Sequence, residues 1–102
     1  MTTMLEKRIK QELRNACDRM RDDLRGYRVV LFGSRAAGSA RERSDFDVGI
    51  LGSTPLPLKA FYHLENLFDE IETLHQINLV DLNRVSSGFR REALKKTEVL
   101  YG

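Results

Sequence analysis

The hydrophobic pattern of this chain changes period several times, from helical spacing to short apolar runs and back. Near the start, apolar residues recur every three or four positions, at Leu5, Ile9, Leu13, Cys17, Met20 and Leu24. This spacing predicts an amphipathic helix, which Thr3 and Glu6 can begin with a capping box. Gly26 ends the pattern, and the aromatic and β-branched run over residues 27–32 predicts a buried strand.

The same alternation of helix and strand patterns continues to the end of the chain. Residues 33–44 show no apolar period and predict a loop with one helical turn, and from Asp45 to Ile50 polar or small residues alternate with apolar ones, as in a half-buried strand. Helical spacing returns at Leu58, Phe61, Leu64, Leu67, Phe68 and Ile71. Residues 77–82 predict another strand, and Ser86 with Ser87 can cap a final helix over residues 89–100. We therefore expect one α/β domain over residues 1–102.

Composition narrows the class of protein. Lys and Arg total 17 and Asp and Glu total 15, and this net charge of +2 is too small by itself to indicate a nucleic-acid binder, so direct nucleic-acid binding is not expected. A single cysteine, Cys17, allows no internal disulfide and fits a reducing cytoplasm. From Met1 onward polar and apolar residues alternate, so neither a cleaved signal nor a membrane span is expected, and we predict a cytoplasmic protein.

A small-residue turn, Gly33-Ser34-Arg35-Ala36-Ala37-Gly38, directly follows the first predicted strand. Glycine lets the backbone approach a phosphate closely, and the amides and the Ser34 hydroxyl can donate hydrogen bonds to it. Taken alone, such a turn is more often a plain connection. Arg35, Arg41 and Arg43 follow it, and Arg35 is the best placed to meet a phosphate, although a surface arginine is usually only solvated.

Two aspartates, Asp45 and Asp47, are separated by one residue at the start of the second predicted strand. Side chains two positions apart on a strand point the same way, about 6 to 7 Å apart along the backbone. Two carboxylates repel each other unless a cation neutralises them, and their oxygens suit Mg²⁺ or Mn²⁺ completed by substrate phosphates. Alone, the pair is more often a solvated strand face. Beside the Gly-Ser turn, it predicts a site for metal and a nucleoside triphosphate.

Together these motifs resemble the nucleotidyltransferase superfamily related to DNA polymerase beta, in particular its minimal nucleotidyltransferases. The resemblance rests on Gly33-Ser34, ten intervening residues, Asp45-x-Asp47, and a third aspartate on a later predicted strand. It implies a small mixed β-sheet flanked by helices, with ATP as substrate and Mg²⁺ or Mn²⁺ as cofactor. The catalytic and metal-binding residues that it implies are Asp45, Asp47 and Asp81. The residues that it implies for nucleotide binding are Gly33, Ser34, Arg35 and Ser44.

The activity implied by the resemblance is transfer of AMP to a protein hydroxyl. The acceptor would be a tyrosine of a cognate helical HEPN ribonuclease toxin, so that this chain would act as its antitoxin, and Asp81 would help to activate that hydroxyl. An aspartate at a strand end can instead cap the following turn. Relatives commonly have an arginine where this chain has Ala37.

The main alternative is a binding module of the same fold, with weak or absent catalysis, that neutralises or assembles with a helical partner by contact. Ala37 keeps this alternative open. A transferase that modifies an antibiotic or tRNA is disfavoured, since such relatives usually carry further domains to hold the acceptor. Either a homo-oligomer or a hetero-oligomer is compatible with the sequence.

Overall fold

The structure is a computed structural model that describes residues 3–41 and 43–102. Met1, Thr2 and Glu42, which belong to the predicted N-terminal stretch and loop, lie outside the described residues. The helices are α1 (Met4–Arg19), α2 (Ser34–Ala37), α3 (Leu58–Asp69) and α4 (Ser87–Ala93). The strands are β1 (Arg28–Phe32), β2 (Phe46–Leu51), β3 (Ile77–Asp81) and β4 (Glu98–Tyr101). Within the described residues, no helix combines the length and apolar character that crossing a bilayer requires.

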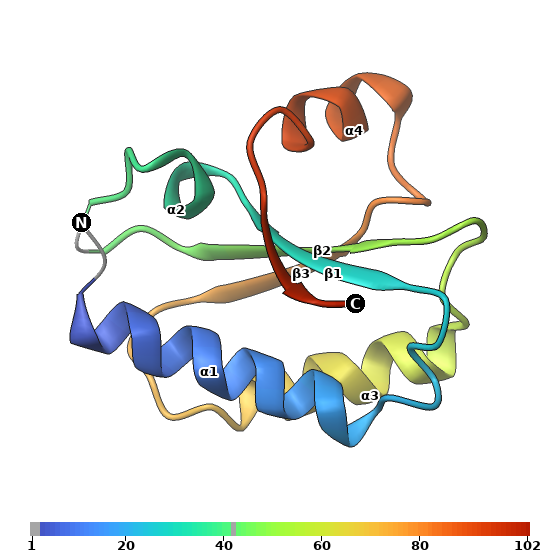
Figure 1. Cartoon of the computed structure of the whole chain (residues 1–102), viewed down its shortest axis with the longest axis horizontal. Helices are drawn as coiled ribbons and strands as arrows, with labels where there is room; N and C mark the ends of the chain where they lie inside the picture. Colours follow the sequence, from blue (N-terminus) through green and yellow to red (C-terminus); the bar gives the residue numbers. More distant parts are fainter. Residues whose placement is uncertain (1–2, 42) are drawn as a thin grey trace.

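The four strands form one mixed sheet in the order β3-β2-β1-β4. Strand β1 is antiparallel to both β2 and β4, whereas β2 and β3 run parallel. Helices α1 and α3 cover one face of the sheet, and α4 lies over the other (Figure 1). The predicted mixed sheet flanked by helices is therefore confirmed.

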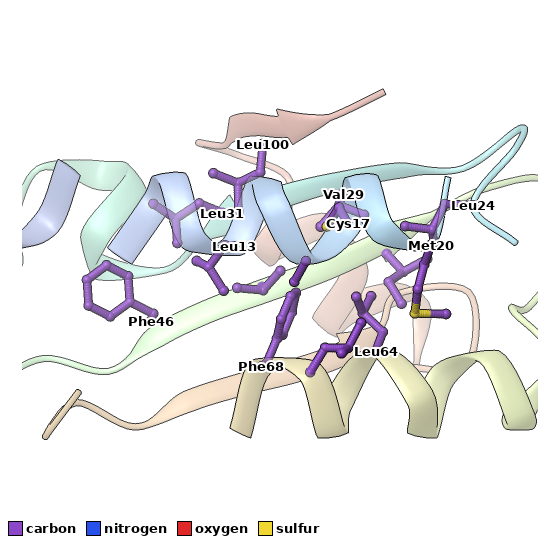
Figure 2. Packing of buried hydrophobic residues seen from close by; sticks show 14 of the residues in the cluster. Leu13, Cys17, Met20, Leu24, Val29, Leu31, Phe46, Leu64, Phe68 and Leu100 are labelled. Carbon is purple, nitrogen blue, oxygen red and sulfur yellow. The ribbon is translucent and has the colours of Figure 1, made fainter. Parts of the chain in front are cut away.

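The larger part of the core lies between the sheet and helices α1 and α3. Leu13, Cys17, Leu64 and Phe68 come from the two helices, and the alternate residues of β1 and β2 face them (Figure 2). Phe46, Val48 and Ile50 are buried on this side of β2. Because side chains alternate along a strand, Asp47 and Gly49 face the opposite side, toward α4. The core thus fixes which face of the sheet receives the polar residues of β2.

The N-terminal helix begins as the sequence predicts. The Thr3 hydroxyl oxygen accepts a hydrogen bond from the Glu6 backbone N–H at 3.1 Å. The Glu6 carboxylate turns away from the start of the helix and pairs with Lys10 and Arg35. The regular helix ends at Arg19, and turns carry Met20 and Leu24 into the core.

The prediction of a final helix over residues 89–100 is wrong. Ser86 does cap a helix by accepting from the Phe89 N–H, but this helix ends at Ala93, and Glu98–Tyr101 forms β4. The strand pairs antiparallel with β1, which would otherwise be a sheet edge, and it buries Leu100 in the main core. Ladder pairing and burial outweigh the local helical pattern of these residues.

Candidate functional site

The turn after β1 is built on Gly33, which joins the strand to the short helix α2. Its backbone has φ 74° and ψ −155°, a conformation that is essentially restricted to glycine. A Cβ atom placed on Gly33 would lie 2.4 Å from Oδ2 of Asp47. Glycine is therefore required here both by its backbone geometry and by the close approach of a carboxylate. The predicted phosphate turn and one predicted metal ligand are brought into contact.

Asp45 and Asp47 converge on a third polar residue, Asn78 of β3. The Asn78 Nδ2 atom lies 3.3 Å from Oδ2 of Asp45 and 3.2 Å from Oδ1 of Asp47. Asp47 and Asn78 are direct partners in the parallel β2–β3 ladder, so their side chains share the α4 face of the sheet. The predicted pairing of the two aspartates at one place is thus present in the structure, with a neighbour that the sequence analysis did not select.

Asp81, which the resemblance implied as a further metal ligand, does not lie with this group in the structure. It is paired with Ile50, three positions along β3 from Asn78, so it points to the opposite face of the sheet. Its side chain is almost fully buried, with Arg84 Nε 3.5 Å away. Its carboxylate accepts hydrogen bonds from the Leu56 N–H at 2.8 Å and from the N–H and side-chain amide of Asn83, each at 2.9 Å. Asp81 therefore holds the loop before α3 and the turn after β3.

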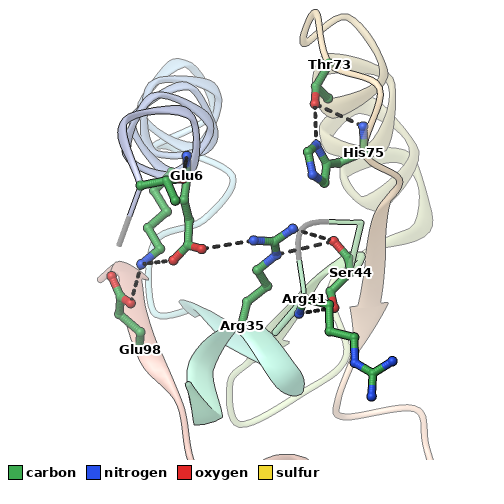
Figure 3. A network of polar contacts seen from close by, with 9 residues as sticks. Glu6, Arg35, Arg41, Ser44, Thr73, His75 and Glu98 are labelled. Atoms are coloured by element: carbon green, nitrogen blue, oxygen red, sulfur yellow. Dashed lines mark hydrogen bonds and ion pairs between the residues drawn. The ribbon is translucent and has the colours of Figure 1, made fainter. Parts of the chain in front are cut away.

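Arg35 occupies a buried network behind the turn (Figure 3). Its guanidinium donates to the Ser44 carbonyl oxygen at 2.7 and 3.2 Å, pairs with Glu6 at 3.0 Å, and lies 4.3 Å from the centre of the Phe46 ring. Ser44 also uses its hydroxyl oxygen to accept from the Arg41 N–H at 2.8 Å. These contacts connect α1, α2 and the residues just before Asp45. In this structure Arg35 and Ser44 therefore support the segment that carries Asp45.

The charges of that network reinforce one another. Burial alone would raise the pKa of Glu6, but hydrogen bonds and positive charge from Lys10 and Arg35 outweigh it and lower the pKa. Lys10 also pairs with Glu98 at the start of β4, at 2.8 Å. The strand that the sequence analysis missed is therefore tied by charge to the helix that supports the Gly33 turn.

A groove of about 540 Å³ opens beside the Gly33-Ser34 turn. Its walls come from the β1–α2 turn and from α4 with the residues that follow it. The lining residues are Phe32, Gly33, Ser34, Ala37, Ser39, Phe89, Glu92, Ala93, Lys95 and Lys96. The groove combines an aromatic ring, two lysines and the Ser34 hydroxyl, which are groups suited to a phosphorylated ligand with a planar base.

The residues present fit a divalent cation that a phosphate-bearing ligand completes. Asp45 and Asp47 supply hard oxygen ligands, and Asn78 shows by its contact with both that their carboxylates reach one place. Among residues 3–41 and 43–102, no group of three or more His, Cys, Asp or Glu side chains assembles that could hold a metal by itself. Mg²⁺ characteristically uses one or two carboxylates together with substrate phosphates.

Comparison with known proteins places this arrangement in context. The family profile described as "Polymerase beta, Nucleotidyltransferase" matches residues 24–102. A protein of Haemophilus influenzae, described as a probable protein adenylyltransferase MntA, is 35% identical over 74 residues. This match covers 72% of the chain and 64% of the relative, so the chain spans a little less than two thirds of that protein.

Solved structures show the same fold. A crystal structure described as a toxin-antitoxin with AMP-PNP matches with a TM-score of 0.63 and 25% identity, covering 87% of this chain and 73% of the matched one. A tri-AMPylated Shewanella oneidensis HEPN toxin in complex with an MNT antitoxin matches with a TM-score of 0.60 and 23% identity, covering 91% and 72%. The second likeness concerns the fold alone.

Proposed function

Because the chain belongs to the polymerase beta nucleotidyltransferase family, we propose that it transfers AMP from ATP to a hydroxyl group of a protein partner. The observation that carries this proposal is the convergence of Asp45 and Asp47 beside the Gly33-Ser34 turn. Carboxylates that gather a cation next to a turn that can donate to phosphate are the parts that nucleotidyl transfer needs.

Each part of the site has a role in the proposed reaction. The amides of the turn and the Ser34 hydroxyl hold phosphate oxygens, while Asp45 and Asp47 hold Mg²⁺ or Mn²⁺. The cation, when bound, neutralises phosphate charge and orients the triphosphate. The acceptor oxygen bonds to the α-phosphorus as the bond from that phosphorus to pyrophosphate breaks, and the hydroxyl proton passes to solvent. Arg35 and Ser44 keep Asp45 in place, and Asp81 takes no part.

We propose a helical HEPN-type toxin as the partner and one of its tyrosines as the acceptor, so that this chain acts as an antitoxin. The proposal is supported by the description of the Haemophilus influenzae relative as a probable protein adenylyltransferase. It is also supported by the toxin-antitoxin structure with AMP-PNP, in which a chain of this fold and 25% identity is found.

The test is the intact mass of the cognate helical partner after incubation with this protein, ATP and Mg²⁺. We expect a gain of one or more AMP units with the wild-type chain and no gain with the double variant Asp45→Asn, Asp47→Asn. A double variant Asp22→Asn, Asp23→Asn removes the same charge from exposed positions and serves as the matched control. If the Asp45 and Asp47 double variant still transferred AMP, the assignment of the site to these two residues would be wrong.

A second candidate function is neutralisation of the partner by contact alone. The specific observation in its favour is that Asn78, which carries no charge, meets the two aspartates where a third carboxylate was expected. A stable complex with no mass gain in the same experiment would favour this binding function over the transferase.

A further inference from the structure

We propose that Asn78 is the third member of the cation site. It positions Asp45 and Asp47 while adding no charge, so that the chain binds a divalent cation weakly by itself and tightly only together with a triphosphate. The inference rests on the proposed function only in placing a cation at these aspartates. It assigns to Asn78 a positioning role that could not be predicted from its residue type or from the apolar residues around it.

The geometry leaves one arrangement for the Asn78 side chain when no cation is bound. Ionised carboxylates only accept hydrogen bonds, so it is the NH₂ end of the amide that must face Asp45 and Asp47. One amide nitrogen carries two hydrogens, and the distances of 3.3 and 3.2 Å allow one for each carboxylate. The same group thus holds together two like charges that would otherwise repel each other.

The backbone pins Asn78 in this position. It is the direct ladder partner of Asp47 on the neighbouring parallel strand, and it is half-buried. Its neighbours Leu79 and Val80 pack into the two cores on either side of the sheet. A one-residue slip of β3 would move both of them to the wrong face, so the register that places Asn78 beside Asp47 is strongly specified.

The number of carboxylates at the site limits its affinity for a divalent cation. Asp45 and Asp47 provide two negative charges, and the other candidate carboxylate on β3, Asp81, faces the opposite side of the sheet with its own hydrogen-bond donors. Affinity for hard cations rises with the number of charged oxygen ligands. A site with two carboxylates and one amide therefore depends on the phosphates of its substrate to complete the coordination, and it exchanges the cation readily without them.

The experiment measures Mn²⁺ binding to the purified chain by electron paramagnetic resonance, first with no nucleotide and then with a non-hydrolysable ATP analogue. The variants are Asn78→Asp, which adds a third carboxylate, and Asn78→Ala, which removes the amide. Asn15→Asp is the control, because Asn15 is exposed on α1 and an aspartate there keeps the acceptor for Gln11.

Without nucleotide, we expect Asn78→Asp to bind Mn²⁺ about tenfold or more tightly than the wild type, Asn78→Ala to bind it no more tightly, and Asn15→Asp to match the wild type. With the analogue bound, the difference in Mn²⁺ affinity between the wild type and Asn78→Asp should become smaller. Equal affinity of Asn78→Asp and wild type would overturn the inference, as would tighter binding by Asn78→Ala, since the amide would then be competing with the cation.

The two proposals fail in different ways. If the wild type transfers no AMP but Asn78→Asp gains Mn²⁺ affinity, the proposed transferase activity is wrong, and the assignment of Asn78 to the cation site is supported. If the wild type transfers AMP and Asn78→Asp gains nothing, the transferase stands and the role of Asn78 is wrong. Thermal unfolding of each variant without metal shows whether it is folded before either result is read.

Discussion

The carboxylate of Asp47 occupies the space beside Gly33 in which a side chain would begin, with Oδ2 only 2.4 Å from the position of an added Cβ. Gly33 also has the positive φ and extended ψ that only glycine adopts readily. We expect Gly33→Ala to cost about 3 kcal/mol of unfolding free energy, from strain and from displacement of Asp47. Urea denaturation measures the cost, and Mn²⁺ binding reports the displaced carboxylate.

Gly38→Ala is the matched control for this prediction. Gly38 also has a positive φ, of 78°, but an added Cβ would meet nothing within 4 Å. Its expected cost is about 1 kcal/mol, from backbone strain alone, with cation binding unchanged. Equal effects of the two substitutions on cation binding would show that the contact between Gly33 and Asp47 has no bearing on the site.

Asp81 is expected to matter for stability and to have no effect on cation binding. Asp81→Ala leaves the buried N–H of Leu56 and the amide of Asn83 without their acceptor, and we expect a loss of about 3 kcal/mol. Asp81→Asn keeps one acceptor oxygen and should lose less. Chemical denaturation gives the stabilities, and Mn²⁺ titration of the folded Asp81→Asn protein should match the wild type. Weaker Mn²⁺ binding by Asp81→Asn would show that Asp81 does contribute to the cation site.

The sequence was sufficient to predict the helix and strand order up to β3, because the hydrophobic period there agrees with the structure. It was not sufficient for the residues after Ala93, where Leu94, Val99 and Leu100 fit a helical pattern as well as a strand. Pairing with β1 decides between them, and that contact joins residues about seventy positions apart. Such a non-local ladder leaves no periodic signal in a segment of four residues.

The candidate site shows the same division between local and non-local information. The Gly33 turn and the Asp45-x-Asp47 pair could be predicted, since the relevant residues are neighbours in the chain. The choice between Asn78 and Asp81 could not, because it depends on the register of β3 against β2. Both interrupt the same apolar run, and since they are three positions apart, only one of them can share the face of Asp47. The odd spacing between Asn78 and Asp81 therefore indicates that they face opposite sides of the sheet, and this was the one clue in the sequence.

Glu6 should make stability depend on pH in the acidic range. Its pKa is lowered in the folded chain below the ordinary value of 4.5, so its contribution is fully present above 4.5 and is lost as pH falls through the folded pKa. We expect Glu6→Gln to cost about 2 kcal/mol at pH 7, and the difference from wild type to shrink below pH 4.5. Denaturation curves at stepped pH values test this.

Glu12→Gln is the control for the Glu6 prediction. It removes an exposed ion pair with Arg8 on the same helix, so its cost at pH 7 should stay below about 1 kcal/mol. A Glu6→Gln penalty as small as that of Glu12→Gln would mean that the buried network around Arg35 adds nothing to stability.

Cys17 should be chemically inert while the chain is folded. It is fully buried in the main core, and burial raises the pKa of its thiol to about 12. At pH 8 only about one thiol in ten thousand is then ionised, and the thiolate is the reactive form. We expect no labelling by a maleimide in native buffer over an hour and complete labelling in urea. Rapid labelling without denaturant would show that the helix α1 opens at this position.

The groove beside Gly33 and Ser34 gives the last prediction, which concerns nucleotide affinity. Lys96 lines this groove, and a cation there can meet phosphate oxygens held by the turn. We expect Lys96→Ala to weaken binding of a non-hydrolysable ATP analogue about five- to tenfold, close to 1 kcal/mol. The loss should shrink as salt rises, since a partly exposed charge is screened. Lys59→Ala, on the exposed side of α3, removes the same charge far from the groove and should leave binding unchanged. If both lysine variants bind the analogue like the wild type, or lose affinity equally, the nucleotide does not lie in this groove.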